Sequence, residues 1–495
     1  MKRREFITFL GGAAAQGLAG NDVKGAPFSS AEHPKSRQPP QEPPSINPNA
    51  VIVAANGSDS NPGTLSKPVL TLAKAAMVAR TRADKTIYLR GGTYSINRQI
   101  NLTSADNGEY WSSYPPDGLN SAILDLSGMR FAMPLNNGHD LGTCFAFLIF
   151  GGSNITIDGI HIRNSPGGGA MICGGVAAQN GWPSTETIAS NNIISNCVIH
   201  DCANGGGPFN TGDGQNSIGI YSTEFPALGC ANDAPSTTLI NNYIYNNQAG
   251  ALSLLAGNSI SHPNTLVANN FIDNSNISAS GPNGDTGAIY TQGIAIGTRI
   301  TNNFIRDAAG RSVPGGAHAV RAIYCDAPTQ NVIVSGNIVT GNTSIGFQWG
   351  AGDNTYEVMS GNIFDMGKYK AFVVWNQSTV GTGNKFNGNI IISSYSGAGA
   401  RAYNTGGGKV VAPQSITDNV YYNYAGGRIN YGGDATTPGD SHPVLENPQI
   451  NGWTYSIANG SPVFNSPVNF PRIKGGWGPP GFAVPQIGSA PSCPH

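Results

Sequence analysis

The sequence is poor in charged residues. Asp, Glu, Lys and Arg together make up 11% of its 495 residues, and the formal net charge is -1. Nucleic acids and acidic membranes are held by broad positive surfaces, which such a composition does not supply. Beyond the first 20 residues, no apolar run approaches the roughly 20 residues of a membrane span. We therefore expect no nucleic-acid partner and no membrane insertion, and a ligand that is neutral or recognised locally.

Residue patterns typical of metal sites are also missing. The seven cysteines contain no Cys-x-x-Cys pair, which argues against a zinc knuckle, and no dense group of aspartates suggests a calcium site. We expect no metal and no cofactor on this ground. Cys202 and Cys230 are a candidate disulfide pair. The odd number of cysteines leaves at least one thiol free, and we expect most of them to be buried structural residues.

What the sequence has in abundance is glycine and a repeated phrase. Glycine accounts for 67 residues and hydrophobic residues for 39%, which suits short strands joined by tight turns. Beyond about residue 154, an Asn or Asp repeatedly leads into a short apolar strand, with intervals from 25 residues (337 to 362) to 46 residues (196 to 242). The leading residues are Asp158, Asn196, Asn242, Asn270, Asn303, Asn337, Asn362, Asn389 and Asn419.

A constant phrase at irregular intervals indicates a constant scaffold coil with loops of variable length. Each coil holds two or three short strands and cannot bury its apolar face alone, but stacked coils make a continuous core. The pattern therefore predicts an all-β parallel β-helix. Each repeated Asn is expected at a bend, in left-handed backbone geometry, with its amide bonded to the same Asn one coil along. Its role is structural rather than catalytic.

The chain divides into four expected segments. Residues 1–20, with Arg3 and Arg4 before a modest apolar run, resemble a twin-arginine export signal, which implies a periplasmic or secreted protein. Residues 21–49 are predicted to be a disordered, Pro- and Ser-rich leader. Residues 50–443 are predicted to form the β-helix, and 444–495 an irregular tail packed on it.

One helix is expected early in the chain. An apolar stripe begins near Thr71 and predicts a helix that covers an open end of the β-helix core. The stripe consists of Leu70, Leu72, Ala73, Ala76, Met77 and Ala79.

Two sets of motifs resemble known β-helix enzymes. Residues 56–64, 67–68 and 87–94 resemble the beginning of right-handed β-helix enzymes of the pectate-lyase-like superfamily. Residues 285–290 and 322–326 resemble the paired phrases of β-xylosidase-type β-helix glycoside hydrolases. The resemblance covers roughly residues 50 to 430. It implies a right-handed parallel β-helix with an N-terminal capping helix, and a carbohydrate-active enzyme whose substrate the fold does not specify.

Two aspartates are the candidate carboxyl pair for glycosidic bond hydrolysis. Such hydrolysis generally uses two carboxyl groups, about 5 to 9.5 Å apart, and neighbouring parallel strands lie about 4.8 Å apart. Aligning Tyr290 with Tyr324 puts Asp285 just before one strand and Asp326 just after the next. The alternative is that both aspartates only cap turns. Arg321, which lies between them in the alignment, is expected to orient a sugar or a carboxylate.

Other candidates surround this pair. His318 is either a proton-transfer group or a loop residue, and Glu224 is an alternative acid. Aligning Tyr221 with Tyr290 places Asn216 beside Asp285. The remaining candidate substrate-binding residues are Asp213, Asn216, Tyr290, Tyr324, Gln348, Trp349 and Trp375. Trp349 and Trp375 are either a stacking platform for sugar rings or packing residues at the rim.

Three functions stay open at this stage. The first is hydrolysis of a poly- or oligosaccharide by Asp285 and Asp326, although the glycoside hydrolase pattern calls for a Glu on the next coil, where this sequence has Gln348 and Trp349. The second is a lyase or epimerase acting on uronates, with Arg321 among the candidate bases and calcium as a cofactor. The third is a glycan-binding or structural β-helix without catalysis.

Overall fold

The computed structural model of the chain describes 21 stretches of sequence. They are 46–130, 145–174, 187–202, 227–231, 234–248, 250–255, 263–277, 287–294, 296–309, 320–341, 343, 345–349, 354–367, 372–376, 383–396, 400–404, 415–431, 439–452, 454–465, 470 and 475–485.

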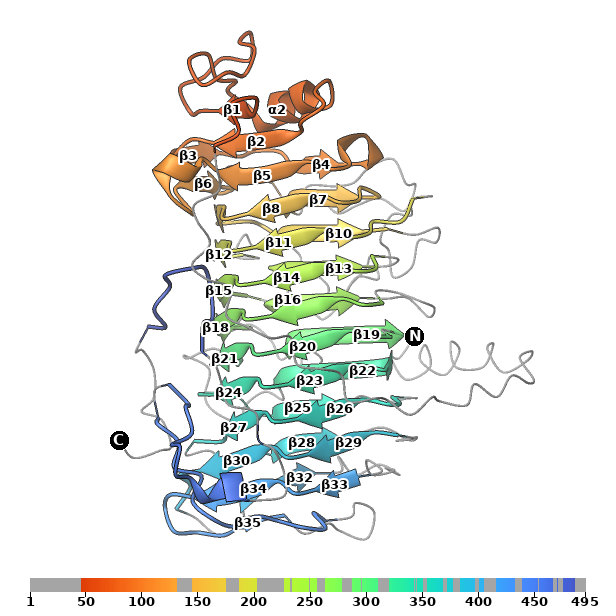
Figure 1. Cartoon of the computed structure of the whole chain (residues 1–495), viewed down its shortest axis with the longest axis vertical. Coiled ribbons are helices and arrows are strands. Elements are labelled where there is room, and N and C mark those ends of the chain that lie inside the picture. Colours follow the sequence, from red (N-terminus) through yellow and green to blue (C-terminus); the bar gives the residue numbers. More distant parts are fainter. Residues whose placement is uncertain are drawn as a thin grey trace, which may run out of the picture. The chain divides into compact units, whose positions relative to one another are not determined.

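Among these residues, the strands form three long parallel sheets in which successive coils lie side by side (Figure 1). A typical coil contributes one strand to each sheet, in the order first, second and third sheet. A separate short pair joins β31 (Ala400–Arg401) to β35 (Ile429–Asn430). This arrangement confirms the predicted parallel β-helix.

The first sheet has 12 strands. They are β1 (Val51–Val53), β2 (Thr86–Leu89), β5 (Tyr110–Ser113), β8 (Thr156–Asp158), β11 (Ile193–Ser195), β14 (Thr238–Ile240), β17 (Leu266–Ala268), β20 (Arg299–Thr301), β23 (Ile333–Ser335), β26 (Val358–Ser360), β29 (Lys385–Asn387) and β33 (Ser415–Thr417).

The second sheet has 11 strands. They are β3 (Gly92–Ser95), β6 (Ala122–Asp125), β9 (His161–Arg163), β12 (Val198–His200), β15 (Tyr243–Asn247), β18 (Phe271–Ser275), β21 (Phe304–Arg306), β24 (Ile338–Thr340), β27 (Ile363–Asp365), β30 (Ile390–Ser393) and β34 (Val420–Asn423).

The third sheet has 10 strands. They are β4 (Ile100–Leu102), β7 (Phe145–Phe150), β10 (Gly168–Cys173), β13 (Leu228–Ala231), β16 (Leu252–Leu255), β19 (Gly287–Ile294), β22 (Arg321–Gln330), β25 (Ile345–Trp349), β28 (Phe372–Asn376) and β32 (Tyr403–Asn404).

A two-residue turn joins the first sheet to the second in the central coils, and the repeated Asn is its second residue. In the turn between β20 and β21, Asn302 adopts a left-handed backbone (φ 52°) and Asn303 is fully buried. The expectation that the repeated Asn itself is left-handed is confirmed for Asn196 (φ 56°) but is wrong by one residue from Asn242 to Asn419. In these coils the left-handed position holds Asn, Gly or Asp, such as Asn241, Gly336 or Asp418, which tolerate positive φ at low cost.

The buried asparagines form a continuous ladder, as predicted. In each rung, the side-chain amide nitrogen donates to the amide oxygen of the Asn one coil along, which also accepts from the backbone N–H of the donor Asn. The amide nitrogen also donates to a backbone carbonyl of the preceding coil. The rungs are 242→270 (3.0 Å), 270→303 (2.9 Å), 303→337 (2.9 Å), 337→362 (2.9 Å), 362→389 (2.9 Å) and 389→419 (3.0 Å), and Asn419 then donates to Asp440 (2.7 Å).

We predict that Asn303→Ala lowers the free energy of unfolding by roughly 3 kcal/mol, because it removes two rungs and leaves the buried backbone N–H of Asn270 without its acceptor. Chemical denaturation of the variant would measure this. The neighbouring Asn302→Gly is the control. Glycine suits the positive φ, so its cost should stay within about 1 kcal/mol. Equal losses for the two variants would contradict a special role for the ladder.

The predicted helix is present as α2 (Leu72–Ala79), and Thr71 caps its N-terminus through a hydrogen bond from the Lys74 N–H. It packs on β1 and β2 and covers that end of the core. The predicted stripe is only partly right: Leu72, Ala76 and Ala79 are buried, as is Ala75. By contrast, Leu70, Ala73 and Met77 are exposed, because the helix lies on the core through a narrower face than the apolar pattern suggested.

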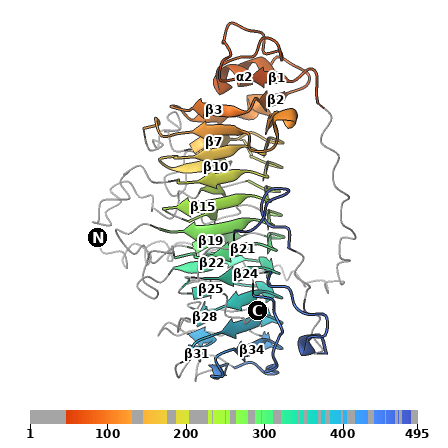
Figure 2. The ribbon, with the colours of Figure 1, turned by 90° about the vertical axis from the view of Figure 1, so that its left-hand side faces the viewer.

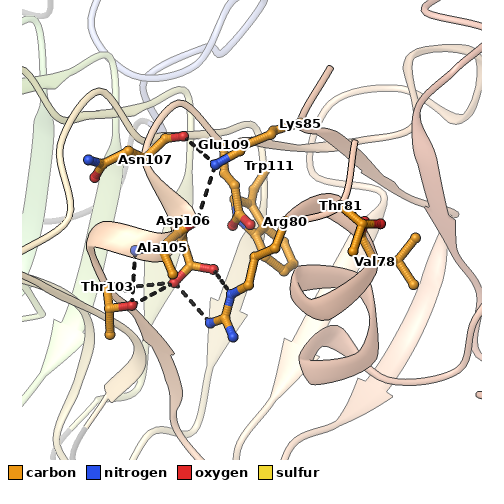
Figure 3. A network of polar contacts seen from close by, with 10 residues as sticks. All are labelled: Val78, Arg80, Thr81, Lys85, Thr103, Ala105, Asp106, Asn107, Glu109 and Trp111. Carbon is orange, nitrogen blue, oxygen red and sulfur yellow. Dashed lines mark hydrogen bonds and ion pairs between the residues drawn. The ribbon is translucent and has the colours of Figure 1, made fainter. Parts of the chain in front are cut away.

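An ion pair and two backbone contacts tie the helix to the coil below it (Figure 3). Arg80 follows α2 and donates to both carboxylate oxygens of Asp106, at 2.7 and 3.0 Å. Asp106 lies in the short 3-10 helix η1 (Ser104–Asp106). The ammonium group of Lys85 donates to the backbone carbonyls of Ala105 and Asn107. The capping helix is thereby anchored by charge as well as by apolar contact.

Beneath this network lies a buried carboxyl group. Glu109 is 1% exposed, and the indole N–H of Trp111 donates to it at 2.8 Å. Burial raises the pKa of Glu109 to about 8, and the negative charge of Asp106 adds to the shift. Glu109 therefore lies in the core as a protonated, neutral acid.

We predict that Glu109→Gln stabilises the protein at alkaline pH. Between about pH 4.5 and pH 8 the folded protein retains a proton that the unfolded chain loses, so stability falls as the pH rises through this window. Glutamine cannot ionise and can still accept from Trp111. Its gain over the wild type should be near zero at acidic pH and reach roughly 1–3 kcal/mol at or above about pH 8.

Thermal unfolding of both proteins across this pH range would measure the gain. The exposed Glu446→Gln is the matched control and should show no such pH-dependent gain. A pH-independent effect of Glu109→Gln would contradict the assignment of Glu109 as a buried neutral acid.

The last part of the chain runs back along the outer face of the second sheet (Figures 1 and 2). Val444 bridges to Val420 of β34, and residues further along pack against the second-sheet column that includes Phe271 and Phe304. These are Ile450, Tyr455, Val463, Phe470 and Trp477. The segment includes the 3-10 helix η5 (Pro462–Asn465). It covers apolar side chains that would otherwise face solvent.

Polar contacts fix this segment as well. The Tyr455 hydroxyl lies 2.7 Å from both Thr340 and Asp365. Arg306 pairs with Asp273 at 2.9 Å, with both side chains nearly buried, and also donates to the Pro485 carbonyl. These contacts join the end of the described chain to the second sheet.

The described cysteines are all buried, which agrees with the expected structural role of most of them. Cys197, Cys202, Cys230 and Cys325 form no disulfide. The candidate disulfide between Cys202 and Cys230 is therefore wrong. Cys202 follows a second-sheet strand, whereas Cys230 lies within β13 of the third sheet.

Candidate functional site

The two motifs that resemble glycoside hydrolases lie on neighbouring strands of the third sheet. In β19, β22 and β25 the register aligns Tyr290 with Tyr324 and Gln348, as the repeated phrases predict for the two tyrosines. Side chains alternate between the two faces of a strand. These three face outward, whereas Cys325 and Trp349 at the next position face the core.

A tyrosine on one coil holds the aspartate of the next. The Tyr290 hydroxyl donates to the Asp326 carboxylate at 2.7 Å. The rings of Tyr290 and Tyr324 meet edge to face, with centroids 5.2 Å apart. Asp326 lies opposite Gln292 at the point where the register of the two strands shifts. A tyrosine of the neighbouring strand therefore helps to position the carboxylate.

An arginine completes the outer surface at the start of β22. The Arg321 guanidinium lies 4.7 Å from the centre of the Tyr324 ring, and its Nε donates to the side-chain oxygen of Gln348. Arg321 is 3% exposed, so this contact is made away from bulk water, where a cation over an aromatic face is stabilised most. We call Tyr290, Arg321, Tyr324, Asp326 and Gln348 the third-sheet cluster.

The third-sheet cluster combines a carboxylate, a hydroxyl donor and a guanidinium. A carboxylate held by a tyrosine can accept or deliver a proton, or bind sugar hydroxyls. Asp326 is partly exposed. Tyr290 and Tyr324 are buried, with 7% and 2% of their surface exposed, and Gln348 is fully buried. Asp326 is thus the most exposed member of the cluster, and the Tyr290 hydroxyl orients its carboxylate.

The structure corrects the expectation for Trp349. Its side chain has no exposed surface and packs edge to face with Phe347 and Phe386, at centroid distances of 4.9 and 6.4 Å. It points inward because it follows the outward-facing Gln348 on the same strand. A stacking platform for sugars therefore cannot include Trp349 in this arrangement.

Several predicted site residues cannot be placed. Asp213, Asn216, Glu224, Asp285 and His318 lie outside the described residues, so their roles stay predictions.

Trp375 lies in β28 as the register partner of Gln348, one coil beyond the third-sheet cluster.

The register of the third sheet does not support setting Tyr221 against Tyr290, on which the alignment of Asn216 with Asp285 was based, and the link between those two residues stays a prediction. In the third sheet, Ser253 of β16 is the partner of both Tyr290 and, on its other side, Gly229 of β13. Gly229 rather than Tyr221 therefore occupies the position two coils before Tyr290. The alignment chose the wrong apolar segment because this coil offers two of them within a long interval.

Glu357 follows Gln348 and Trp349 in the sequence and is the next glutamate after Asp326. Glu357 is fully buried inside the core just before β26, and burial raises its pKa well above the usual range of a carboxyl group. The indole of Trp349 approaches this carboxyl group without good hydrogen-bond geometry and opposes the shift only in part. Glu357 therefore lies in the interior next to the first sheet, whereas Asp326 faces outward from the third sheet.

His200 and Asp201 lie on and just after β12 of the second sheet, so they belong to a different wall from the third-sheet cluster. Within the described part of the chain, no group of three or more His, Cys, Asp or Glu side chains is arranged to hold a metal ion. No helix among the described residues is long and apolar enough to cross a membrane.

Comparison with known proteins supports the fold. No family model matches the sequence. A stretch of 168 residues, 31% of this chain, is 29% identical to pectate lyase L of Paenibacillus polymyxa, and it spans 36% of the length of that relative. The structure is similar to the GH136 lacto-N-biosidase of Eubacterium ramulus, with a TM-score of 0.50, 11% identity, and coverage of 80% of this chain and 67% of that one. With the three parallel sheets, these findings show an all-β right-handed parallel β-helix.

We predict that Trp349→Phe lowers the free energy of unfolding by roughly 1–3 kcal/mol, because it opens a cavity between Phe347 and Phe386. The same variant should bind glycans like the wild type, since the indole has no exposed surface. Denaturation and glycan titration on the same samples would check both statements. Weakened glycan binding with unchanged stability would instead restore the stacking role.

Proposed function

We propose that the protein is an exported carbohydrate-active enzyme that cleaves glycosidic bonds in a poly- or oligosaccharide. The observation that carries this proposal is the hydrogen bond from the Tyr290 hydroxyl to the Asp326 carboxylate across two neighbouring coils. A scaffold needs no such contact on its outer face, because the core and the asparagine ladder already stack the coils. The contact does, however, hold a partly exposed carboxylate in one orientation.

The names of similar proteins support a carbohydrate substrate. The relative with 29% identity is a pectate lyase, and the similar solved structure is a glycoside hydrolase. Both names describe enzymes that cleave linkages between sugars, although by different reactions. They favour the substrate class without favouring one mechanism.

Hydrolysis is the mechanism we propose first. Asp326 and Asp285 would be the two carboxyl groups, one delivering a proton to the leaving oxygen and the other acting as a nucleophile or as the base for water. Tyr290 would hold Asp326 in place through the bond at 2.7 Å. Arg321, fixed by Tyr324 and Gln348, would add positive potential beside the carboxylate.

A lyase or epimerase acting on uronates is the second candidate, favoured by the name of the pectate lyase relative. In this case Arg321 would serve as the base or would bind the uronate carboxylate, and calcium would be the expected cofactor. Arg321 is buried and bonded to Gln348, so it would need to exchange that partner for the substrate. For this reason we place hydrolysis first.

We predict that Asp326→Asn lowers glycan cleavage about 100-fold or more while the protein stays folded, because the amide can neither donate a proton as an acid nor act as a nucleophile. A broad polysaccharide panel would supply the substrate. Reducing ends without new ultraviolet absorbance would indicate hydrolysis, whereas the absorbance of an unsaturated uronate would indicate elimination.

Asp418→Asn is the matched control, since Asp418 adopts a positive φ of 59° that Asn tolerates, and it lies in a turn after the first sheet. Its activity should equal that of the wild type. Unchanged cleavage by Asp326→Asn would remove the third-sheet cluster as the active site. Failure of the wild type to cut any glycan in the panel would contradict the enzymatic proposal and favour a binding or structural role.

A further inference from the structure

Two histidines meet on the outer face of the second sheet, on a different wall from the third-sheet cluster. His161 in β9 and His200 in β12 belong to neighbouring coils, and their Nε2 atoms are 2.7 Å apart. Their ring centroids are 4.9 Å apart with the planes tilted by 45°. At this distance one nitrogen donates a hydrogen bond and the other accepts it. The two nitrogens therefore point toward each other with a single proton between them.

One of the two rings is fixed from behind. The Nδ1 of His200 lies 2.5 Å from the Asp201 carboxylate, and the ring stacks on Tyr245 with centroids 4.4 Å apart. With Nδ1 engaged by the carboxylate, the neutral imidazole carries its lone pair on Nε2, toward His161. A carboxylate behind a histidine in this manner is the usual outer partner of a metal-binding imidazole, because it sets the tautomer and the ring orientation.

The local charge also suits a cation. Arg163, the register partner of His200, is neutralised by Asp125 at 2.9 Å. Asp201 adds a further negative charge, its side chain is 34% exposed, and His161 is partly exposed. Burial and Arg163 lower the pKa of His161, so its imidazole is neutral near pH 7 and no proton competes with a metal ion there.

We propose that His161 and His200 bind one divalent transition-metal ion, with zinc(II) as the reference case, and that Asp201 orients His200 as an outer partner. Two imidazole nitrogens on a tetrahedral zinc ion lie about 3.3 Å apart, given zinc–nitrogen distances of about 2.0–2.1 Å. A separation of 2.7 Å needs a small opening of the rings to admit the ion. Because the described residues offer two ligands rather than three, water completes the coordination.

Such an ion would link two consecutive coils on a wall that the third-sheet cluster does not share. Its role is therefore independent of glycan cleavage. Because the ion binds the folded chain, it raises the stability of the stacked coils by an amount that grows with the logarithm of its concentration relative to its Kd.

Calorimetric titration with zinc chloride, on the full chain without a histidine tag, tests this site. We expect one equivalent to bind saturably and to raise the unfolding temperature. His161→Ala and His200→Ala should each abolish this binding, and Asp201→Asn should weaken it by about 10- to 100-fold. His442→Ala is the control, because His442 is exposed and its ring contacts the hydroxyl groups of Thr417 and Ser441. It should leave binding unchanged.

The absence of stoichiometric zinc binding by the folded wild type would overturn the proposal and leave a hydrogen-bonded histidine pair only. Binding that survives in both His161→Ala and His200→Ala would overturn it as well, because the ion would then lie elsewhere. Circular dichroism of the metal-free variants shows whether they fold. If either alanine variant is unfolded, His200→Gln takes its place, and it must lose the binding for the proposal to stand.

Discussion

The buried amide chain of the asparagine ladder is the interaction on which the rest of the structure depends. Each rung satisfies a backbone N–H and a backbone carbonyl inside the wall, which would be costly to leave without partners. Because the rung geometry is the same from Asn242 to Asn419, the turn between the first and second sheets keeps one length and one register. That fixed register propagates around each coil. It is the reason that Tyr290 meets Asp326 although 36 residues separate them.

The same constraint explains which wall is free to carry function. The first and second sheets are joined by two-residue turns in the central coils, and the outer face of the second sheet is covered from β18 to β34 by residues beyond Val444. The third sheet differs, because long connections lead into two of its strands. One runs from β18 to β19 and the other from β21 to β22. Long connections on a rigid scaffold are where binding and catalytic groups concentrate. The third-sheet cluster lies on this wall.

Much of the fold could be predicted from sequence because repetition carries it. The asparagine phrase gave the coils, and the shared Ala-Ile-Tyr of β19 and β22 gave the register that the structure confirms. The incorrect predictions concern which face of a strand, or which position in a coil, a residue occupies, and not the repeat itself. Trp349 was expected at a surface although it faces the core, and a one-residue shift along a strand reverses the face of every side chain. Tyr221 was aligned where Gly229 lies, since an interval of 46 residues offers more than one apolar segment. Which side chains cover a carboxylate depends on contacts between coils, which no local pattern records.

The two buried glutamates show why unusual acidity alone does not mark the site. Strongly shifted carboxyl groups are often catalytic, and Glu109 and Glu357 both have raised pKa values. Both, however, immediately precede a first-sheet strand, at an interior corner where other coils place Asn192 or Thr298 to bond the backbone of the coil before. A polar side chain is therefore expected at this corner for structural reasons. The raised pKa values follow because the corner excludes water. Asp326 differs in the face that it occupies: it faces outward, is partly exposed, and accepts a hydrogen bond from a hydroxyl of another coil. Because carboxyl groups also occur in the interior of this fold, the face on which a carboxyl group lies is a better guide to its chemistry than its pKa.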